Sequence, residues 1–92
     1  MNNGLNLNAK DNAGFTALHF AVMSNQYEIA DYLITKGAKI DSQDNFGNTP
    51  LWRAAMEYED ENNKLIQLLL MNGADPRIEN NYGISAESLL SE

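Results

Sequence analysis

The stretch that decides the fold is DNFGNTPL at residues 44–51, because residues 11–18 read DNAGFTAL, the same pattern 33 residues earlier. Asp44, Gly47, Thr49 and Leu51 each match a residue of their own type in that earlier copy. A third, weaker copy follows 36 residues further on, where residues 80–87 read NNYGISAE. Repetition at a spacing of this size indicates a repeat architecture.

The spacing of apolar residues predicts two helices in each repeat. Thr49 is a good N-cap, and Pro50 follows at the first helical position, where its missing N–H costs nothing. The second helices show apolar residues at i, i+1, i+4 and i+5, which form one face; these are Ile29, Ala30, Leu33 and Ile34, and then Leu65, Ile66, Leu69 and Leu70. We expect helices at about 17–24, 28–36, 50–57 and 63–72, and a fifth that begins near Ser85.

The change in spacing from 33 to 36 residues indicates three extra residues within 58–63, between two predicted helices. An insertion there lengthens a loop at small entropic cost and leaves both helices intact. The two helices of one repeat cannot bury their apolar faces alone, so the repeats must stack to form a continuous core.

The opening DNAGFTALHFA at 11–21 resembles the start of an ankyrin repeat, and YLITKGA at 32–38 resembles its second helix with the Gly-Ala ending. The resemblance covers nearly the whole chain. It implies an all-α ankyrin repeat solenoid, with stacked helix–loop–helix units and short β-hairpin or turn fingers. It also divides a single domain, 1–92, into the tail of a preceding unit (1–10), a repeat (11–43), a repeat with the insertion (44–79) and a partial terminal repeat (80–92).

The resemblance further implies recognition of another protein through the fingers and the first helices. The alignment assigns Lys10, Asn12, Phe15, Gln43, Asn45, Phe46, Asn48, Glu79, Asn81, Tyr82 and Ile84 to the fingers, and Met23, Met56 and Glu57 to the first helices. Phe46 and Tyr82 are the best anchors, because aromatic residues at the centre of an interface often dominate its energy. Each ring could instead pack on its own finger, and Trp52 could belong either to the core or to this surface.

The composition narrows the partners. The formal net charge of −7 disfavours nucleic acids and anionic membranes, whose binding depends on Lys and Arg, and it favours a basic protein partner. No cysteine is present, so disulfides and thiolate metal sites are excluded. The first residues lack the basic and apolar stretches of a signal peptide, and we expect a cytoplasmic location.

No motif predicts catalysis, a cofactor or a metal. The single histidine, His19, could be arranged with Thr16 and Asp11 into a catalytic group, but the resemblance places this Thr-x-x-His spacing in a structural hydrogen-bond network. Carboxylates at 57–61 lack the spacing of a calcium loop, so a solvated acidic loop is expected. The chain is therefore not expected to be an enzyme.

Two functions remain open. One is a binding module that recognises and blocks another protein, as an inhibitor or an immunity-type protein does. The other is a structural or self-associating segment of a longer ankyrin array. Glu87, where the other copies have leucine, suits a terminal capping unit. On the opposite side we expect apolar residues of 18–22 and 29–34 to be exposed, which would favour a homodimer through that N-terminal face.

Overall fold

The computed structural model describes residues 6–58, 60 and 62–90. Five helices lie within them: α1 (Ala17–Met23), α2 (Tyr27–Thr35), α3 (Pro50–Tyr58), α4 (Lys64–Met71) and α5 (Ala86–Leu90). The bounds differ from those predicted by at most one residue. Strand pairing in the described residues is limited to one isolated bridge, between Glu79 and Ser85. The predicted all-α class is therefore confirmed.

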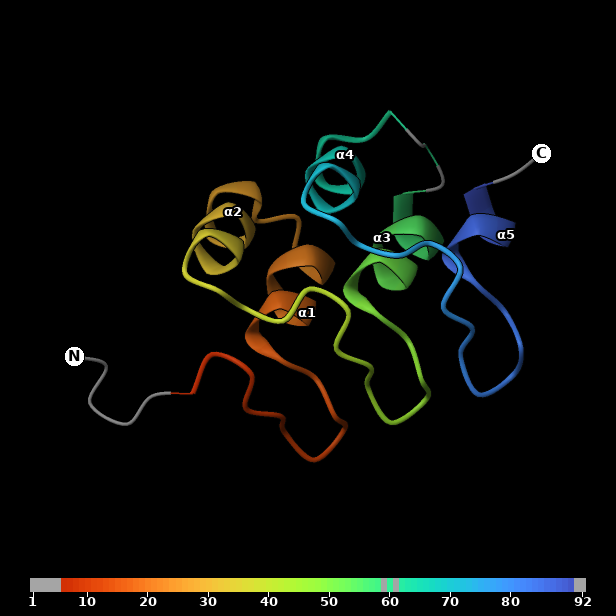
Figure 1. Cartoon of the computed structure of the whole chain (residues 1–92), viewed down its shortest axis with the longest axis horizontal. Helices are drawn as coiled ribbons and strands as arrows, with labels where there is room; N and C mark the ends of the chain where they lie inside the picture. The colour runs from red at the N-terminus through yellow and green to blue at the C-terminus, as the bar shows by residue number, and fades with distance from the viewer. Residues whose placement is uncertain (1–5, 59, 61, 91–92) are drawn as a thin grey trace.

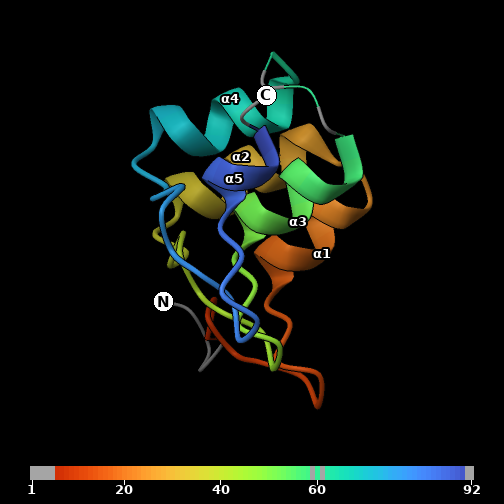
Figure 2. The ribbon, with the colours of Figure 1, turned by 90° about the vertical axis from the view of Figure 1, so that its right-hand side faces the viewer.

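The helices form two layers, and the fingers project from one side (Figure 1). Helices α1, α3 and α5 make one row, with α3 packed between the other two, while α2 and α4 make the second row. The view from the C-terminal side shows the loops before α1, α3 and α5 lying one behind another (Figure 2). This is the stack of helix pairs expected from the repeats.

Short polar side chains begin the helices at the predicted places. The Thr16 hydroxyl accepts from the His19 backbone N–H at 3.3 Å, and the Thr49 hydroxyl accepts from the Trp52 N–H at 3.0 Å. Ser85 does the same for Ser88 at 3.2 Å. Each bond satisfies one of the N–H groups that a helix start leaves without a partner.

The core lies between the two layers. Its largest members are Leu18, Val22, Leu51, Leu65, Ile66 and Leu69, all almost fully buried. The expectation that the helix at 18–22 exposes its apolar residues on the N-terminal side is wrong for Leu18 and Val22. The physical reason is that α1 packs against both α2 and α3, so these side chains point into the core.

The N-terminal face is apolar at other positions. Ile29 and Tyr32 on α2 are 51% and 59% exposed. Leu65 and Leu68 stand 36 residues later on α4 and are only 1% and 8% exposed, because α2 packs against α4. The open apolar surface of this end therefore belongs to α2.

Candidate protein-binding site

The fingers that carry most of the predicted site are tied to one another by asparagines. The Asn45 backbone N–H donates to the Ala13 carbonyl at 2.9 Å, and its side-chain amide donates to the Asn12 carbonyl at 2.7 Å. One unit later, the Asn81 backbone N–H donates to the Phe46 carbonyl and its side-chain amide donates to the Asn45 carbonyl, both at 2.9 Å. Asn45 and Asn81 are exposed but use their donors to hold neighbouring fingers together.

Two further polar residues of the predicted site also bridge the fingers. The Lys10 ammonium donates to the Gln43 carbonyl at 2.7 Å. The Gln43 side-chain amide donates to the Gly47 carbonyl at 2.9 Å and lies 3.4 Å from that of Glu79. These side chains fix the spacing of the fingers. Of the predicted site, it is mainly the aromatic residues that take no part in holding the fingers together.

Close stacking of the fingers requires glycine at the turn. Gly47 has a φ of +82°, and a Cβ added there would lie 2.6 Å from the Asn81 side-chain oxygen. Gly14 is equivalent, with a φ of +85° and a distance of 2.6 Å to the Asn45 backbone nitrogen. A side chain at either place would strain the backbone and push the next finger away.

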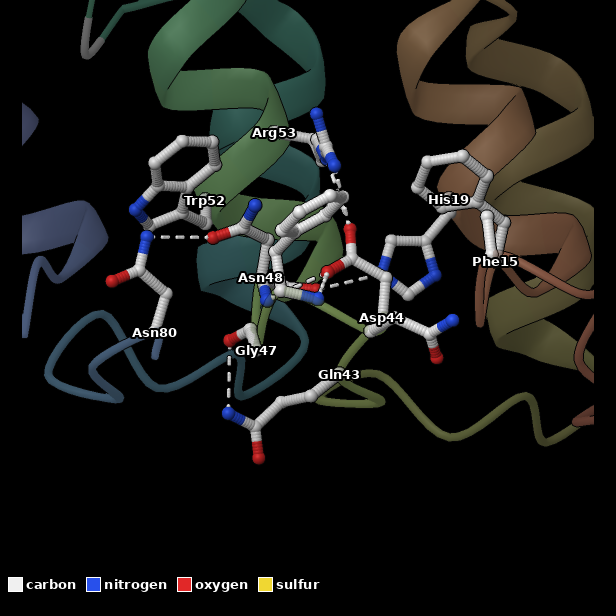
Figure 3. Close-up of polar contacts among 12 residues, drawn as sticks. Phe15, His19, Gln43, Asp44, Gly47, Asn48, Trp52, Arg53 and Asn80 are labelled. Atoms are coloured by element: carbon white, nitrogen blue, oxygen red, sulfur yellow. Dashed lines mark hydrogen bonds and ion pairs between the residues drawn. The ribbon is translucent and has the colours of Figure 1, made fainter. Parts of the chain in front are cut away.

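His19 closes the junction between the unit that contains α1 and the unit that contains α3 (Figure 3). Its Nε2 lies 2.9 Å from the Asn48 carbonyl oxygen and must donate there, so Nδ1 accepts from the Thr16 backbone N–H at 3.1 Å. Burial lowers the pKa of His19, although the Asn48 carbonyl and the Asp44 charge act in the opposite direction. The imidazole is thus neutral, buried and fully bonded, as the structural interpretation predicted, and it offers no reactive group to solvent.

An ion pair stands beside this histidine. The Arg53 Nη2 lies 2.8 Å from Asp44 Oδ2, and the Asp44 carboxylate is fully buried. The guanidinium carbon of Arg53 lies 5.1 Å from the centre of the Phe15 ring and 5.7 Å from that of Trp52. Its charge is therefore neutralised and held between two aromatic rings, where cation–π attraction adds to the pairing.

Asn48 corrects the predicted site. It was expected on an exposed fingertip, but it is 4% exposed, and its Oδ1 accepts from the Asn80 side-chain amide at 2.9 Å. The physical reason is its place immediately before the N-cap Thr49, where the finger returns to the core and the third finger covers it. The side chain of Asn48 holds two units together and leaves little surface for a partner to contact.

A groove of about 450 Å³ lies between α3 and the two fingers beside it. Four residues that the sequence assigns to the binding surface line it and are exposed, namely Phe46, Met56, Tyr82 and Ile84. Trp52, Arg53 and Leu89 also line it, and Asn48 and Asn80 contribute as well. Sequence reasoning missed Arg53 and Leu89 and left Trp52 undecided. The signal for the first lay in Trp52-Arg53, which replace His19-Phe20 of the earlier repeat.

The other predicted residues lie outside the groove lining. Asn12, Glu57 and Glu79 are exposed, and Met23 is exposed near the end of α1. Phe15 is partly buried, because its ring packs edge-on against Phe20 at 5.3 Å between centroids. The structure therefore brings Phe46, Met56, Tyr82 and Ile84 into one hollow, while the other exposed predicted residues lie elsewhere on the fingers or, for Met23 and Glu57, on α1 and α3.

Metal and membrane sites find no support in the described part of the chain. No group of three His, Asp or Glu side chains there could hold a metal ion. Glu59 and Glu61, two of the carboxylates considered from the sequence, lie outside the described residues. None of the described helices is long and apolar enough to cross a membrane. The cytoplasmic location stays a prediction.

Known proteins with similar sequences share the repeat. Residues 1–80 match the family described as ankyrin repeats in three copies. An ankyrin repeat protein of Rickettsia conorii is 36% identical over 64 residues, which are 67% of this chain and 91% of that protein. The human transient receptor potential cation channel subfamily A member 1 is 36% identical over 77 residues, 84% of this chain and 7% of the channel. The chicken NF-kappa-B inhibitor alpha is 43% identical over 51 residues, 55% of this chain and 16% of the inhibitor.

Proposed function

Because the chain belongs to the ankyrin repeat family, whose repeats are protein-interaction modules, we propose that it binds a partner protein through its finger side, centred on Phe46 and Tyr82. The observation that carries this proposal is the position of these two rings. They occupy the same turn position in successive fingers, they are half-exposed and 73% exposed respectively, and they flank one groove. Rigid, exposed aromatic rings beside a hollow are typical of interface hot spots.

The support also comes from what surrounds the rings. The amide donors of Asn45 and Asn81 and the ammonium of Lys10 are engaged between fingers, so the surface is held in place before any partner arrives. A preorganised surface loses less conformational freedom when it binds. The net charge of −7 supports a basic partner, because opposite charge speeds the encounter and disfavours acidic proteins.

A role as an inhibitor is the finer part of the proposal. One relative is named an inhibitor, of NF-kappa-B, and a small rigid module that covers a partner's surface can block that surface. The fully bonded, buried His19 and the neutralised Arg53 favour such a binding role over catalysis. The partner is to be identified by experiment.

The experiment is comparative capture. The immobilised chain and a Phe46→Ala/Tyr82→Ala variant are exposed to lysate of the source cells. Met71→Ala is the control, because Met71 is exposed on α4 and does not line the groove. A partner is a protein retained by the first and third chains and lost by the second. With the purified partner, each single alanine variant should weaken binding by about 1–3 kcal/mol, the range of interface hot spots. Equal binding by all variants would contradict the proposed surface.

Self-association is the second candidate, and one observation favours it. Ile29 and Tyr32 form an apolar strip on α2 that no described helix covers. Two copies could pair these strips about a twofold axis, because such an interface is self-complementary. Sedimentation at micromolar concentration distinguishes a dimer of this kind from a monomer.

A further inference from the structure

The two junctions between units are closed differently. At the first, the Nε2 of His19 donates to the Asn48 carbonyl, 2.9 Å away. At the second, Trp52 stands 33 residues after His19, and the equivalent carbonyl, 36 residues after Asn48, is that of Ile84. The Trp52 indole Nε1 makes no hydrogen bond, and it is the one buried side-chain polar atom of the described residues without a partner. The link that closes the first junction is therefore missing at the second.

The groove lies at this second junction. Trp52 and Ile84, the two residues that would make the missing link, both line it, together with Phe46, Met56 and Tyr82. Its volume of about 450 Å³ falls within the range of pockets that enclose small ligands, and its walls are mainly apolar. A hollow of this size accommodates one large apolar side chain.

The exposed charged residues that stand next to lining residues in the sequence include two glutamates. The one cation among the described residues that line the groove, Arg53, is paired with the buried carboxylate of Asp44 at 2.8 Å. Glu57 follows the lining residue Met56 and Glu79 precedes the lining residue Asn80, and both glutamates are exposed. A partner segment with basic residues beside its apolar side chain complements this surface.

We propose that the Trp52 groove selects the partner, by accepting one aromatic or large aliphatic side chain from a protein segment that has Lys or Arg on either side. This inference rests on the proposed binding function and states which chemistry that function recognises.

Trp52 is the single tryptophan of the chain, so its fluorescence reports on the groove directly. The probes are three synthetic peptides: acetyl-Gly-Lys-Arg-Phe-Lys-Gly-amide, the same peptide with alanine in place of phenylalanine, and the phenylalanine peptide with glutamate at each basic position. We expect the first to change the Trp52 emission with a dissociation constant at least about tenfold lower than those of the other two. Equal titrations, or no change in emission with any peptide, would overturn the proposal.

Matched variants separate the groove from general attraction. Met56→Arg places a cation in the groove, and Met71→Arg places the same cation on α4, where Met71 is 81% exposed and lies outside the groove lining. The first should weaken binding of the phenylalanine peptide by at least about tenfold, while the second should leave its affinity within about twofold of the wild-type value. Circular dichroism and urea denaturation confirm that both variants fold. Equal weakening by the two variants would show that charge alone decides binding, and would overturn the groove assignment.

A third variant tests the missing link. Trp52→His restores the residue of the first unit, whose Nε2 would donate to the Ile84 carbonyl and close the groove. Calorimetry replaces fluorescence for this variant, and the phenylalanine peptide should again bind at least about tenfold more weakly. Unchanged peptide affinity would overturn the proposal.

The outcome is distinct from that of the broader function. A captured partner that binds wild type and Met56→Arg equally would refute the groove and leave the binding function standing. Groove-specific peptide binding without any captured protein would support the groove and refute the broader function in the cells used.

Discussion

Helices α2 and α4 are built on the same pattern, yet their equivalent residues have different surroundings. Leu65 and Leu68 of α4 are buried against α2, while Ile29 and Tyr32, at the matching positions of α2, are more than half exposed. The side chains are similarly apolar, so the difference arises from the neighbour and not from the residue. In a stacked repeat, each unit contributes to stability mainly through the interface with the next one.

The largest expected difference in stability comes from truncating the side chain at each of two matching positions, Leu65 and Ile29. Leu65→Ala should lower the free energy of unfolding by about 2–5 kcal/mol, because it removes a fully buried side chain and leaves a cavity. Ile29→Ala should cost less than about 1 kcal/mol, because half of that side chain is already in water. Urea denaturation of both variants measures the difference. Equal losses would mean that the open face of α2 is covered in solution.

The next test compares two glycines with positive φ. Gly37 and Gly47 both adopt this conformation, so alanine at either position should cost about 1–2 kcal/mol of backbone strain. A Cβ at Gly37 meets nothing within 4 Å, whereas one at Gly47 lies 2.6 Å from the next finger. Gly47→Ala should therefore be the more destabilising by at least about 1 kcal/mol. Thermal unfolding measures the difference. Equal melting temperatures of the two variants would contradict the stacked fingers.

A smaller effect is expected in the pH dependence of the free energy of unfolding, because the first junction contains His19 and the second has Trp52 in its place. Burial lowers the pKa of His19 below its ordinary value of 6.5, so the unfolded chain binds a proton at a higher pH than the folded chain does. The stabilisation from the neutral imidazole is complete above pH 6.5 and is lost progressively as the pH falls below that value. The free energy of unfolding should fall between pH 7.5 and 5.5, and less so in His19→Gln. The same slope in both proteins would assign the effect to other groups.

The smallest expected effect is at the open face itself. Ile29→Ser/Tyr32→Ser should change the free energy of unfolding of the monomer by less than about 1 kcal/mol, because both side chains are largely in water. If the chain pairs through α2, sedimentation should show a wild-type dimer and a monomeric double variant. A dimer that survives the double substitution would rule out this face as the contact.

Periodicity and capping residues predicted the helices well. The spacing of Thr16, Thr49 and Ser85 gave three helix starts, and each hydroxyl makes the expected bond. The exposure of Phe46 and Tyr82 also follows from their place before a turn glycine. These features are local, so the sequence near each residue carries the necessary information.

The remaining features depend on contacts between units. Asn48 and Asn45 look alike in a fingertip sequence, yet one is buried by Asn80 and the other bonds to the previous finger. The groove beside Trp52 lies where the bond to a residue 32 positions away is missing, and Leu89 from α5 lines it too. Pattern reasoning within one repeat gives no direction for such side chains, because the neighbouring unit decides where they point.

The ties between fingers have a consequence for motion over time. The backbone N–H of Asn45 is held by Ala13, and that of Asn81 is held by Phe46, so each amide proton is released only when its own junction opens. Local opening in proteins is graded, and segments with few contacts exchange their protons first. Tyr82, Ile84 and Leu89 belong to the segment that the Asn81 bond holds. One wall of the groove therefore opens when that bond opens. Exchange of the Asn81 proton should therefore report the opening of this junction, and a bound partner should slow it while the Asn45 proton keeps its own rate.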